Sequence, residues 1–270
     1  MGSLQWGGAR IHFAERGEGP VVLFLHAFPL SSGMWLKQMN ALKDGFRAVA
    51  MDFPGFGKSE RLAAPATMDL FAQAALATLD AVGAQKAAVV ALSMGGYAAL
   101  ELRERAPERV AALALCDTRA TADTPESRKA REATARAVEE DGCQVLAERM
   151  IPNLVSSAAT DALKREVEKL ITENSSEGAA AALRAMAGRR DFTPFLGQVG
   201  CPTLVVVGAH DTMTPPSEAQ ALARAISGAA LETIPAAGHL SNLENPKAFD
   251  TALRAFLEAN RARFAAPLPS

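Results

Sequence analysis

The sequence predicts a doubly wound α/β fold, in which helices cover both faces of a mostly parallel sheet. Short apolar runs alternate with amphipathic helical stretches, and each run is continuously apolar instead of alternating with polar residues. Continuous runs are typical of parallel strands that are buried on both faces. A chain of 270 residues is long enough for one such domain that carries an insertion.

Six runs have the length and composition of strands. They are Val21–Leu25, Phe46–Met51, Ala87–Ala91, Val110–Leu115, Thr203–Val207 and Leu231–Ile234. Helices are predicted between them. One is capped by Thr67 and ends at Gly83, another covers Gly95–Arg105, and the last starts at Asn245 with Pro246 in its first turn.

The pattern changes after residue 118, because no strand-like run follows until residue 203. Four charged, Ala-rich stretches there predict helices: Glu126–Glu140, Cys143–Met150, Thr160–Thr172 and Glu177–Met186. The predicted organisation is a core of residues 1–118 and 191–270, interrupted by a helical cap of residues 119–190. Such an insertion is expected over the carboxyl ends of the strands, where ligands bind in open α/β sheets.

Composition excludes several classes of protein. The formal net charge is −2, which leaves no basic footprint for nucleic acid. The three cysteines form no CxxC pair, so no metal or cofactor site is expected. The first residues do not resemble a signal peptide, and the longest apolar run is too short to cross a membrane. We expect a cytoplasmic protein whose partner is a small molecule.

The run Val89–Gly96 predicts a nucleophile elbow. A buried strand ends at Ser93, and a helix of small residues begins immediately after it. Such a turn strains the serine backbone and lifts the hydroxyl above the sheet. Ala91 and Gly95, two positions either side of the serine, are small enough for neighbouring backbone to pass, although the usual residue at position 91 is glycine.

Four segments resemble loops of the α/β-hydrolase family, and the resemblance spans nearly the whole chain. Leu25–Pro29 is similar to the His-Gly loop, and Asp52–Ser59 is similar to the family's Asp-x-x-Gly-x-Gly-x-Ser loop. Gly208–Asp211 and Gly238–His239 resemble the loops that carry the acid and the histidine. The resemblance implies a hydrolase with a catalytic triad in the order Ser, acid, His.

The chain has only four histidines, which narrows the choice of general base for Ser93. His12 lies in the opening strand region, His26 lies in the His-Gly-like loop, and His210 directly precedes a candidate acid. His239 follows the last predicted strand, so we assign the base to it. Asp211 is the favoured acid because it follows the strand Thr203–Val207, and Asp117, at the end of the preceding strand, is the rival.

An oxyanion intermediate needs two hydrogen-bond donors. The N–H of Met94 is the natural first, and the resemblance implies the N–H of Phe28 as the second. Met150, Ile151 and Leu154 are the cap residues assigned to the substrate pocket together with Phe28 and Met94, although packing within the cap is the commoner role of such apolar residues at helical spacing. Arg189 and Arg190 lie where the chain returns from the cap to the core, a segment that we call the hinge. Either arginine is a possible ligand for a substrate carboxylate, although a salt bridge at the hinge is the favoured role.

The leading functional hypothesis is hydrolysis of a small or medium carboxylic ester or lactone through an acyl-enzyme. The resemblance points to the enol-lactonase and carboxylesterase branches, and it also includes cofactor-free perhydrolases, carbon–carbon bond hydrolases and aminopeptidases. A serine at the elbow argues against haloalkane dehalogenases and epoxide hydrolases, which carry aspartate there. A non-catalytic small-molecule binding protein on the same fold is the alternative from another class.

Overall fold

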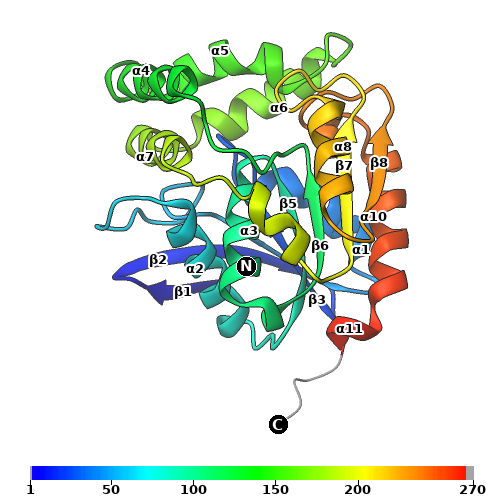
Figure 1. Cartoon of the computed structure of the whole chain (residues 1–270). Coiled ribbons are helices and arrows are strands. Elements are labelled where there is room, and N and C mark those ends of the chain that lie inside the picture. Colours follow the sequence, from blue (N-terminus) through cyan, green and yellow to red (C-terminus); the bar gives the residue numbers. More distant parts are fainter. Residues whose placement is uncertain (1, 266–270) are drawn as a thin grey trace.

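The computed structural model describes residues 2–265 and contains one eight-stranded sheet (Figure 1). The strands are β1 (Gly2–Trp6), β2 (Ala9–Arg16), β3 (Val21–Leu25), β4 (Arg47–Met51), β5 (Ala87–Leu92), β6 (Val110–Cys116), β7 (Thr203–Gly208) and β8 (Ala230–Ile234). Their order across the sheet is β1-β2-β4-β3-β5-β6-β7-β8. The pairs from β4 to β8 are parallel, whereas β2 pairs antiparallel with both β1 and β4.

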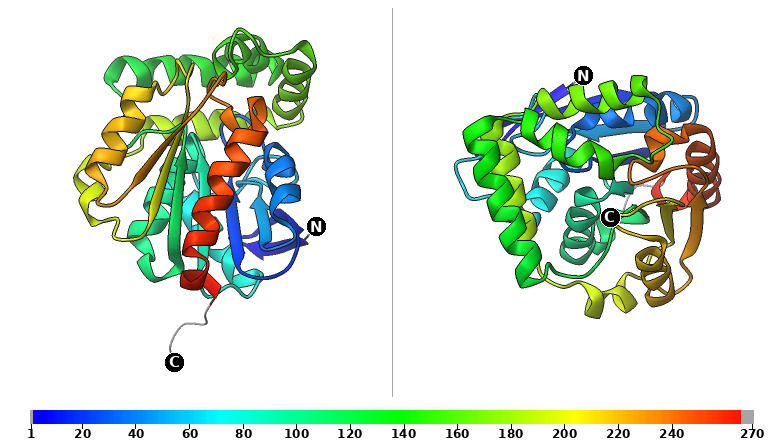
Figure 2. Two further views of the ribbon diagram at one scale, coloured as in Figure 1. Left: turned by 90° about the vertical axis from the view of Figure 1, so that its right-hand side faces the viewer. Right: turned by 90° about the horizontal axis from the view of Figure 1, so that it is seen from above.

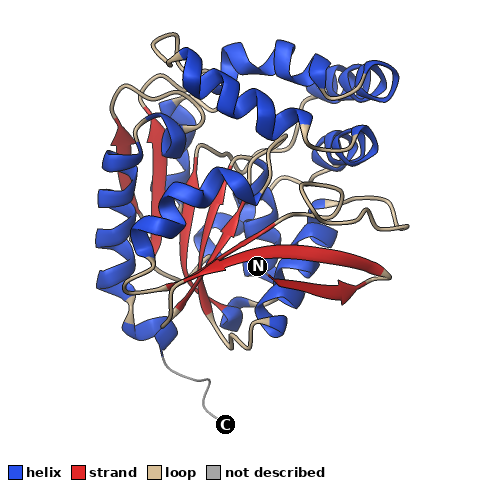
Figure 3. Cartoon of the chain, turned by 180° about the vertical axis from the view of Figure 1, so that it is seen from behind, coloured by secondary structure: helices blue, strands red, loops and turns tan. Residues whose placement is uncertain are grey.

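The predicted α/β fold is confirmed, and the six predicted strand runs coincide with β3 to β8 to within one residue at either end. Strands β3 and β5 are buried along their whole length, as continuous apolar runs require. Strand β1 alternates between half-buried and exposed residues, and β2 has buried residues at alternate positions in its first half, so the continuous-run criterion does not delimit them. Figure 3 shows these two strands extending from one edge of the sheet.

Helices cover both faces of the sheet (Figure 2). Helices α1 (Leu36–Leu42) and α10 (Pro246–Asn260) pack together on one face, and α11 (Ala262–Ala265) follows α10. Helices α3 (Met94–Arg105) and α8 (Pro216–Ala225) lie across the opposite face, where α2 (Met68–Ala81) packs against α3. A short helix, α9 (Ser241–Glu244), and three 3₁₀ turns at Ser32–Trp35, Pro107–Arg109 and Thr193–Gln198 complete the helical elements.

Four helices lie between β6 and β7 in the sequence and form a layer over one end of the sheet (Figure 2). They are α4 (Pro125–Asp141), α5 (Gln144–Leu154), α6 (Asp161–Thr172) and α7 (Ser176–Ala187). Helix α4 packs against α7, and α5 packs against α6. The four predicted helices are confirmed, but the predicted end of the second at Met150 is wrong. Helix α5 continues through Pro152: the proline donates no hydrogen bond to the helix, but the N–H of Val155 still donates to the carbonyl of Ile151 (3.3 Å).

The N-terminal loops are joined by one buried carboxylate, that of Asp52. It accepts hydrogen bonds from the N–H groups of Ser32 (2.7 Å) and Lys58 (3.0 Å), and it contacts Nδ1 of His12 at 2.9 Å. The turn that resembles the family's Asp-x-x-Gly-x-Gly-x-Ser loop is thereby tied to the loop after β3. His12 is held at Asp52 and takes no part in the contacts of Ser93.

No helix in the described part of the chain is long and apolar enough to cross a membrane. The three cysteines are buried and unpaired. Among residues 2–265, no cluster of three or more His, Cys, Asp or Glu side chains has an arrangement suited to a metal ion.

Candidate active site

The residues predicted for the site follow the carboxyl ends of adjacent parallel strands. Ser93 comes directly after β5, Phe28 lies in the loop after β3, Asp211 lies three residues beyond β7, and His239 lies in the loop after β8. Because parallel strands end at the same edge of a sheet, these loops converge although the residues are far apart in sequence.

Ser93 occupies a sharp turn between β5 and α3. Its φ of 54° and ψ of −114° lie in a region that residues with a side chain rarely adopt, so the backbone there is strained. The N–H of Ser93 donates to the carbonyl of Cys116 on β6 (2.9 Å), and the carbonyl of Ser93 accepts from the hydroxyl of Thr118 (2.8 Å). The neighbouring strand therefore holds the turn in its strained form.

The small residues around Ser93 are required by close packing. A Cβ atom at Gly95 would lie 2.4 Å from the carbonyl oxygen of Leu25, at the end of β3. A backbone oxygen cannot move away without disturbing the strand, so only glycine fits at this position. Ala91, where the family usually has glycine, is fully buried in β5 without disrupting the strand.

His239 links Ser93 to Asp211 through its two ring nitrogens. Nε2 lies 2.8 Å from Oγ of Ser93, and Nδ1 lies 2.8 Å from Oδ2 of Asp211. An imidazole that donates its Nδ1–H to Asp211 has an unprotonated Nε2, which accepts the hydroxyl proton of Ser93. Both side chains beyond the serine are almost completely buried, with 1% of His239 and none of Asp211 exposed.

The carboxylate of Asp211 is fully hydrogen-bonded. Oδ1 accepts from the N–H groups of Met213 (2.8 Å) and Thr214 (3.0 Å), and Oδ2 accepts from the hydroxyl of Thr214 (2.6 Å). Burial by itself raises the pKa of Asp211, but the hydrogen bonds and the charge of the neighbouring imidazole outweigh it, so the pKa lies below the usual value. Asp211 therefore stays ionised and fixes the orientation of the His239 ring.

Asp117, the rival acid, does not contact His239. Its Oδ1 accepts from the N–H of Gly208 (2.8 Å), and its Oδ2 accepts from the hydroxyl of Ser241. Burial, together with repulsion from Asp211, raises the pKa of Asp117 well above its usual value. Asp117 thus joins the ends of β6 and β7 to α9, next to the histidine loop.

Of the two predicted oxyanion donors, Met94 follows Ser93 in the sequence and Phe28 borders the same cavity as Ser93. Met94 is the first residue of α3, so its N–H has no acceptor one turn earlier in the helix. Phe28 belongs to the loop that His26 fixes. Nδ1 of His26 contacts the carbonyl of Ala27 (2.9 Å), and Nε2 accepts from the N–H of Phe53 (3.0 Å).

A cavity of about 290 Å³ opens above Ser93. It is lined by Phe28, Ser93, Tyr97, Arg119, Asp123, Ser127, Ala130, Arg131, Met150, Met186, Arg189, Met213, Thr214 and His239. The lining therefore contains residues of the loops that follow the strands, of α3, and of the α4–α7 layer, so the cavity lies between the sheet and this layer.

Of the residues expected to bind substrate, Phe28 and Met150 line this cavity. Met94, Ile151 and Leu154 are not among its lining residues in the described chain. The side chains of Met94 and Leu154 are fully buried, and the carbonyl of Leu154 accepts from the N–H of Leu240 (2.9 Å). The end of α5 thus supports the histidine loop.

Several lining residues were not expected from sequence. Tyr97 lies four residues after Ser93 on α3, one helical turn along, and this spacing could have identified it. Thr214 follows Asp211 by three residues, a spacing at which a hydroxyl reaches back to a carboxylate. Arg119 and Arg131 gave no comparable signal, because their positions depend on how the α4–α7 layer packs over the sheet.

Both arginines at the hinge make ion pairs. Nη1 of Arg189 lies 2.6 Å from Oδ1 of Asp123, and Nη2 of Arg190 lies 2.9 Å from Oε2 of Glu101. Arg189 also borders the cavity and lies over the ring of Tyr97, with 4.2 Å between the guanidinium carbon and the ring centroid.

The sheet, the strained serine turn and the Ser93–His239–Asp211 contacts together define the class of α/β proteins whose site is built on a nucleophile elbow. The family model for the alpha/beta hydrolase fold matches residues 20–246, and the chain belongs to this family. Membership of this family supports hydrolysis of a small molecule as the activity.

The chain is similar to proteins with several named activities, among them enol-lactonases, esterases and putative carbamate hydrolases. The chain is 28% identical to 3-oxoadipate enol-lactonase 2 of Acinetobacter baylyi over 253 residues, which cover 92% of this chain and 93% of that protein. Among solved structures, a thermophilic esterase from Thermogutta terrifontis with bound malate is similar at 37% identity and a TM-score of 0.89, covering 93% of this chain and 94% of the other. The enol-lactonase from Burkholderia xenovorans has 27% identity and a TM-score of 0.89, covering 95% and 100%.

Proposed function

We propose that the protein is a serine hydrolase that cleaves a small or medium carboxylic ester or lactone through an acyl-enzyme intermediate. The observation that carries this proposal is the continuous hydrogen-bonded chain from Oγ of Ser93 through His239 to Asp211. The named relatives agree with it, since both esterases and enol-lactonases attack an ester carbonyl.

In the first step Oγ of Ser93 attacks the carbonyl carbon while Nε2 of His239 takes the hydroxyl proton. Asp211 stabilises the imidazolium that forms, without becoming protonated itself. The negative charge on the carbonyl oxygen is placed at the N–H groups of Met94 and Phe28. Each such donor typically lowers the barrier by about 3 kcal/mol.

The tetrahedral intermediate collapses when His239 gives its proton to the leaving alkoxide. An alcohol departs from an ester, whereas in a lactone it stays attached to the acyl chain. Water then attacks the acyl-enzyme, His239 again takes a proton, and Ser93 is restored. The four helices α4–α7 act in this proposal as a cap, corresponding to residues 119–190, that limits the size of the acyl group.

Two alternative reactions use the same triad: transfer of the acyl group to hydrogen peroxide, and hydrolysis of a carbon–carbon bond. No contact in the cavity favours either of them over ester hydrolysis. The proposed compartment is the cytoplasm, where the three unpaired thiols are compatible with reducing conditions.

The test compares wild type with Ser93→Ala on p-nitrophenyl acetate and butyrate and with a fluorophosphonate probe. We expect kcat of the variant to fall by about 10⁶-fold and labelling to disappear. Ser217→Ala, which removes an exposed serine of α8, should keep both. Persistent labelling of Ser93→Ala would identify another nucleophile. A wild type that binds ligands but turns over no ester would instead be a binding protein.

A further inference from the structure

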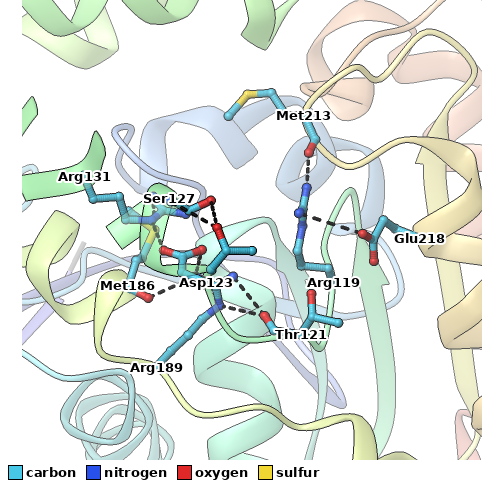
Figure 4. Close-up of polar contacts among 10 residues, drawn as sticks. Arg119, Thr121, Asp123, Ser127, Arg131, Met186, Arg189, Met213 and Glu218 are labelled. Atoms are coloured by element: carbon cyan, nitrogen blue, oxygen red, sulfur yellow. Dashed lines mark hydrogen bonds and ion pairs between the residues drawn. The ribbon is translucent and has the colours of Figure 1, made fainter. Parts of the chain in front are cut away.

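Three arginines lie around the cavity above Ser93. Arg119, Arg131 and Arg189 all border it, together with the carboxylate of Asp123 (Figure 4). A pocket for a small apolar acyl group does not need arginines, and placing them there costs free energy because each guanidinium loses part of its hydration. The contacts of each arginine show which of them has donors left for a ligand.

Arg189 has at most one N–H left, since the hydrogen bonds that it makes within the protein use four of the five N–H groups of its guanidinium. Nη1 donates to Asp123 (2.6 Å) and to the carbonyl of Met186 (2.9 Å), while Nε (3.2 Å) and Nη2 (2.9 Å) donate to the carbonyl of Thr121. Only 4% of its side chain is exposed. Arg189 therefore holds the hinge and positions Asp123.

Arg131 has donors to spare. Its Nε donates to Oδ2 of Asp123 (2.5 Å), and its Nη1 lies 3.5 Å from the sulfur of Met186, which is a weak acceptor. Within residues 2–265, no hydrogen bond of Arg131 uses Nη2. About a quarter of the side chain is exposed, so these donors are accessible to a ligand in the cavity.

Ser127 lies one helical turn before Arg131 on α4, so both side chains project from the same face of the helix. Both border the cavity, and the small Ala130 lies beside them. The hydroxyl of Ser127 accepts a hydrogen bond from the hydroxyl of Thr124 (3.2 Å), which leaves its own proton for another acceptor. This face of α4 thus offers a guanidinium and a hydroxyl to the same group.

Arg119 approaches from the loop after β6. It donates through Nη2 to the carbonyl of Met213, and its Nη1 lies 3.8 Å from Oε1 of Glu218, beyond hydrogen-bond distance. The cluster therefore contains three guanidinium groups and the carboxylates of Asp123 and Glu218. Three positive charges against two negative charges leave one positive charge without a partner in the cluster.

We propose that Arg131 and Ser127, with Arg119 across the cavity, bind a carboxylate of the substrate, so that the preferred ester or lactone is an organic anion. The free N–H groups of the guanidinium and the hydroxyl can donate to the two oxygens of a planar carboxylate. The excess positive charge favours an anion over a neutral group. The site borders the same cavity as Ser93, so one substrate can contact both. This inference rests on the proposed ester hydrolysis and narrows its substrate class.

The experiment compares esters that differ only in charge. The mono-p-nitrophenyl ester of glutarate is paired with the p-nitrophenyl ester of glutaramate, in which a neutral amide replaces the carboxylate. A second pair, 4-acetoxybenzoate and 4-acetoxybenzamide, places the charge in the alcohol part. In at least one pair, wild-type kcat/KM should be about 10- to 100-fold higher for the anion, as expected for hydrogen bonds to a charged group.

Substitution then tests the residues. Arg131→Met should bring the anion-to-neutral ratio close to one, whereas Arg131→Lys should keep part of the preference. Arg136→Met is the matched control, because Arg136 lies on the same helix with 71% of its side chain exposed and does not border the cavity. It should keep the wild-type ratio.

The wild-type ratio is decisive even if Arg131→Met does not fold. A ratio of one or less in both pairs overturns the inference, as does a preference that survives in both Arg131→Met and Arg119→Met. In those outcomes the neutral esters are still hydrolysed and the proposed function stands. Failure to hydrolyse any of the four esters, together with failure to label Ser93, would refute the proposed function itself.

Discussion

The hydroxyl of Ser241 donates a hydrogen bond to the carboxylate of Asp117, while His239 makes its contact with Asp211. The two aspartates lie at the ends of neighbouring strands but bind different groups. Asp117 binds the N–H of Gly208 and the hydroxyl of Ser241 on α9, whereas Asp211 orients the imidazole of His239.

The first prediction compares the two aspartates. Asp211→Asn should lower kcat by about 10⁴-fold, because an amide that keeps its hydrogen bond with Nδ1 holds His239 in the wrong tautomer. Asp117→Asn should lower it by less than about tenfold, since the amide oxygen still accepts from Gly208 and the hydroxyl of Ser241 can reverse its hydrogen bond. Steady-state kinetics on p-nitrophenyl butyrate measure both, and the reverse ranking would move the role of acid to Asp117.

The second prediction concerns the elbow. Gly95→Ala should destabilise the fold by about 1–3 kcal/mol, the usual cost of overpacking, although alanine by itself favours a helix. The added methyl would meet the carbonyl oxygen of Leu25. Gly197→Ala is the control, because its Cβ would meet nothing within 4 Å, and it should change stability by less than about 0.5 kcal/mol. Urea unfolding of the two variants gives the comparison, and equal stability would show that β3 and α3 adjust freely.

The third prediction is a loss of stability in acid through His26. Burial, opposed by the carbonyl of Ala27 and the charge of Asp52, lowers the pKa of His26 to about 4. An unfolded chain binds a proton at this residue near pH 6.5, whereas the folded protein does not until about pH 4. The free energy of unfolding should therefore fall by up to about 3 kcal/mol between pH 6.5 and 4.

Urea titrations at pH 7, 6 and 5 measure this dependence. His26→Gln cannot titrate, so the difference in stability between wild type and this variant should shrink as the pH falls. A difference that stays constant from pH 7 to pH 5 would mean that His26 is protonated equally in both states.

The fourth prediction concerns the buried ion pair of the hinge. Arg189→Met should cost about 3 kcal/mol, the lower end of the range for breaking a buried pair, because Arg131 still neutralises Asp123. Lys37→Met, which removes an exposed pair with Glu166 at 3.4 Å, should cost no more than about 1 kcal/mol. Thermal melting of both variants tests the ranking, and a neutral Arg189→Met would show that Asp123 does not need its buried partner.

The order of strands and helices could be predicted because each depends on local pattern. The apolar runs of β3, β5 and β7 are continuous, and the helices carry their own caps, such as Thr67 and Asn245. The segments of the site could be predicted for the same reason, since Ser93 and Asp211 closely follow strand ends. Strand β2 pairs with the distant β4, and the end of α5 contacts the histidine loop at Leu240. Strand β1 pairs with the adjoining β2, but it has no continuous apolar run, so the criterion used for the other strands did not delimit it.

By itself the sequence determined the fold class and the loops that carry the serine, the aspartates and the histidine, because strand periodicity and turn chemistry act over a few residues. Only the tertiary structure decided that His239 contacts Asp211 and not Asp117, and that Arg131 faces the cavity while Leu154 does not. The first choice depends on the loops after β7 and β8, where Gly208 and Ser241 bind Asp117. The second depends on how α4 and α5 are rotated over the sheet. The rotation is set by packing between elements that lie up to a hundred or more residues apart, and no local pattern in the chain encodes it.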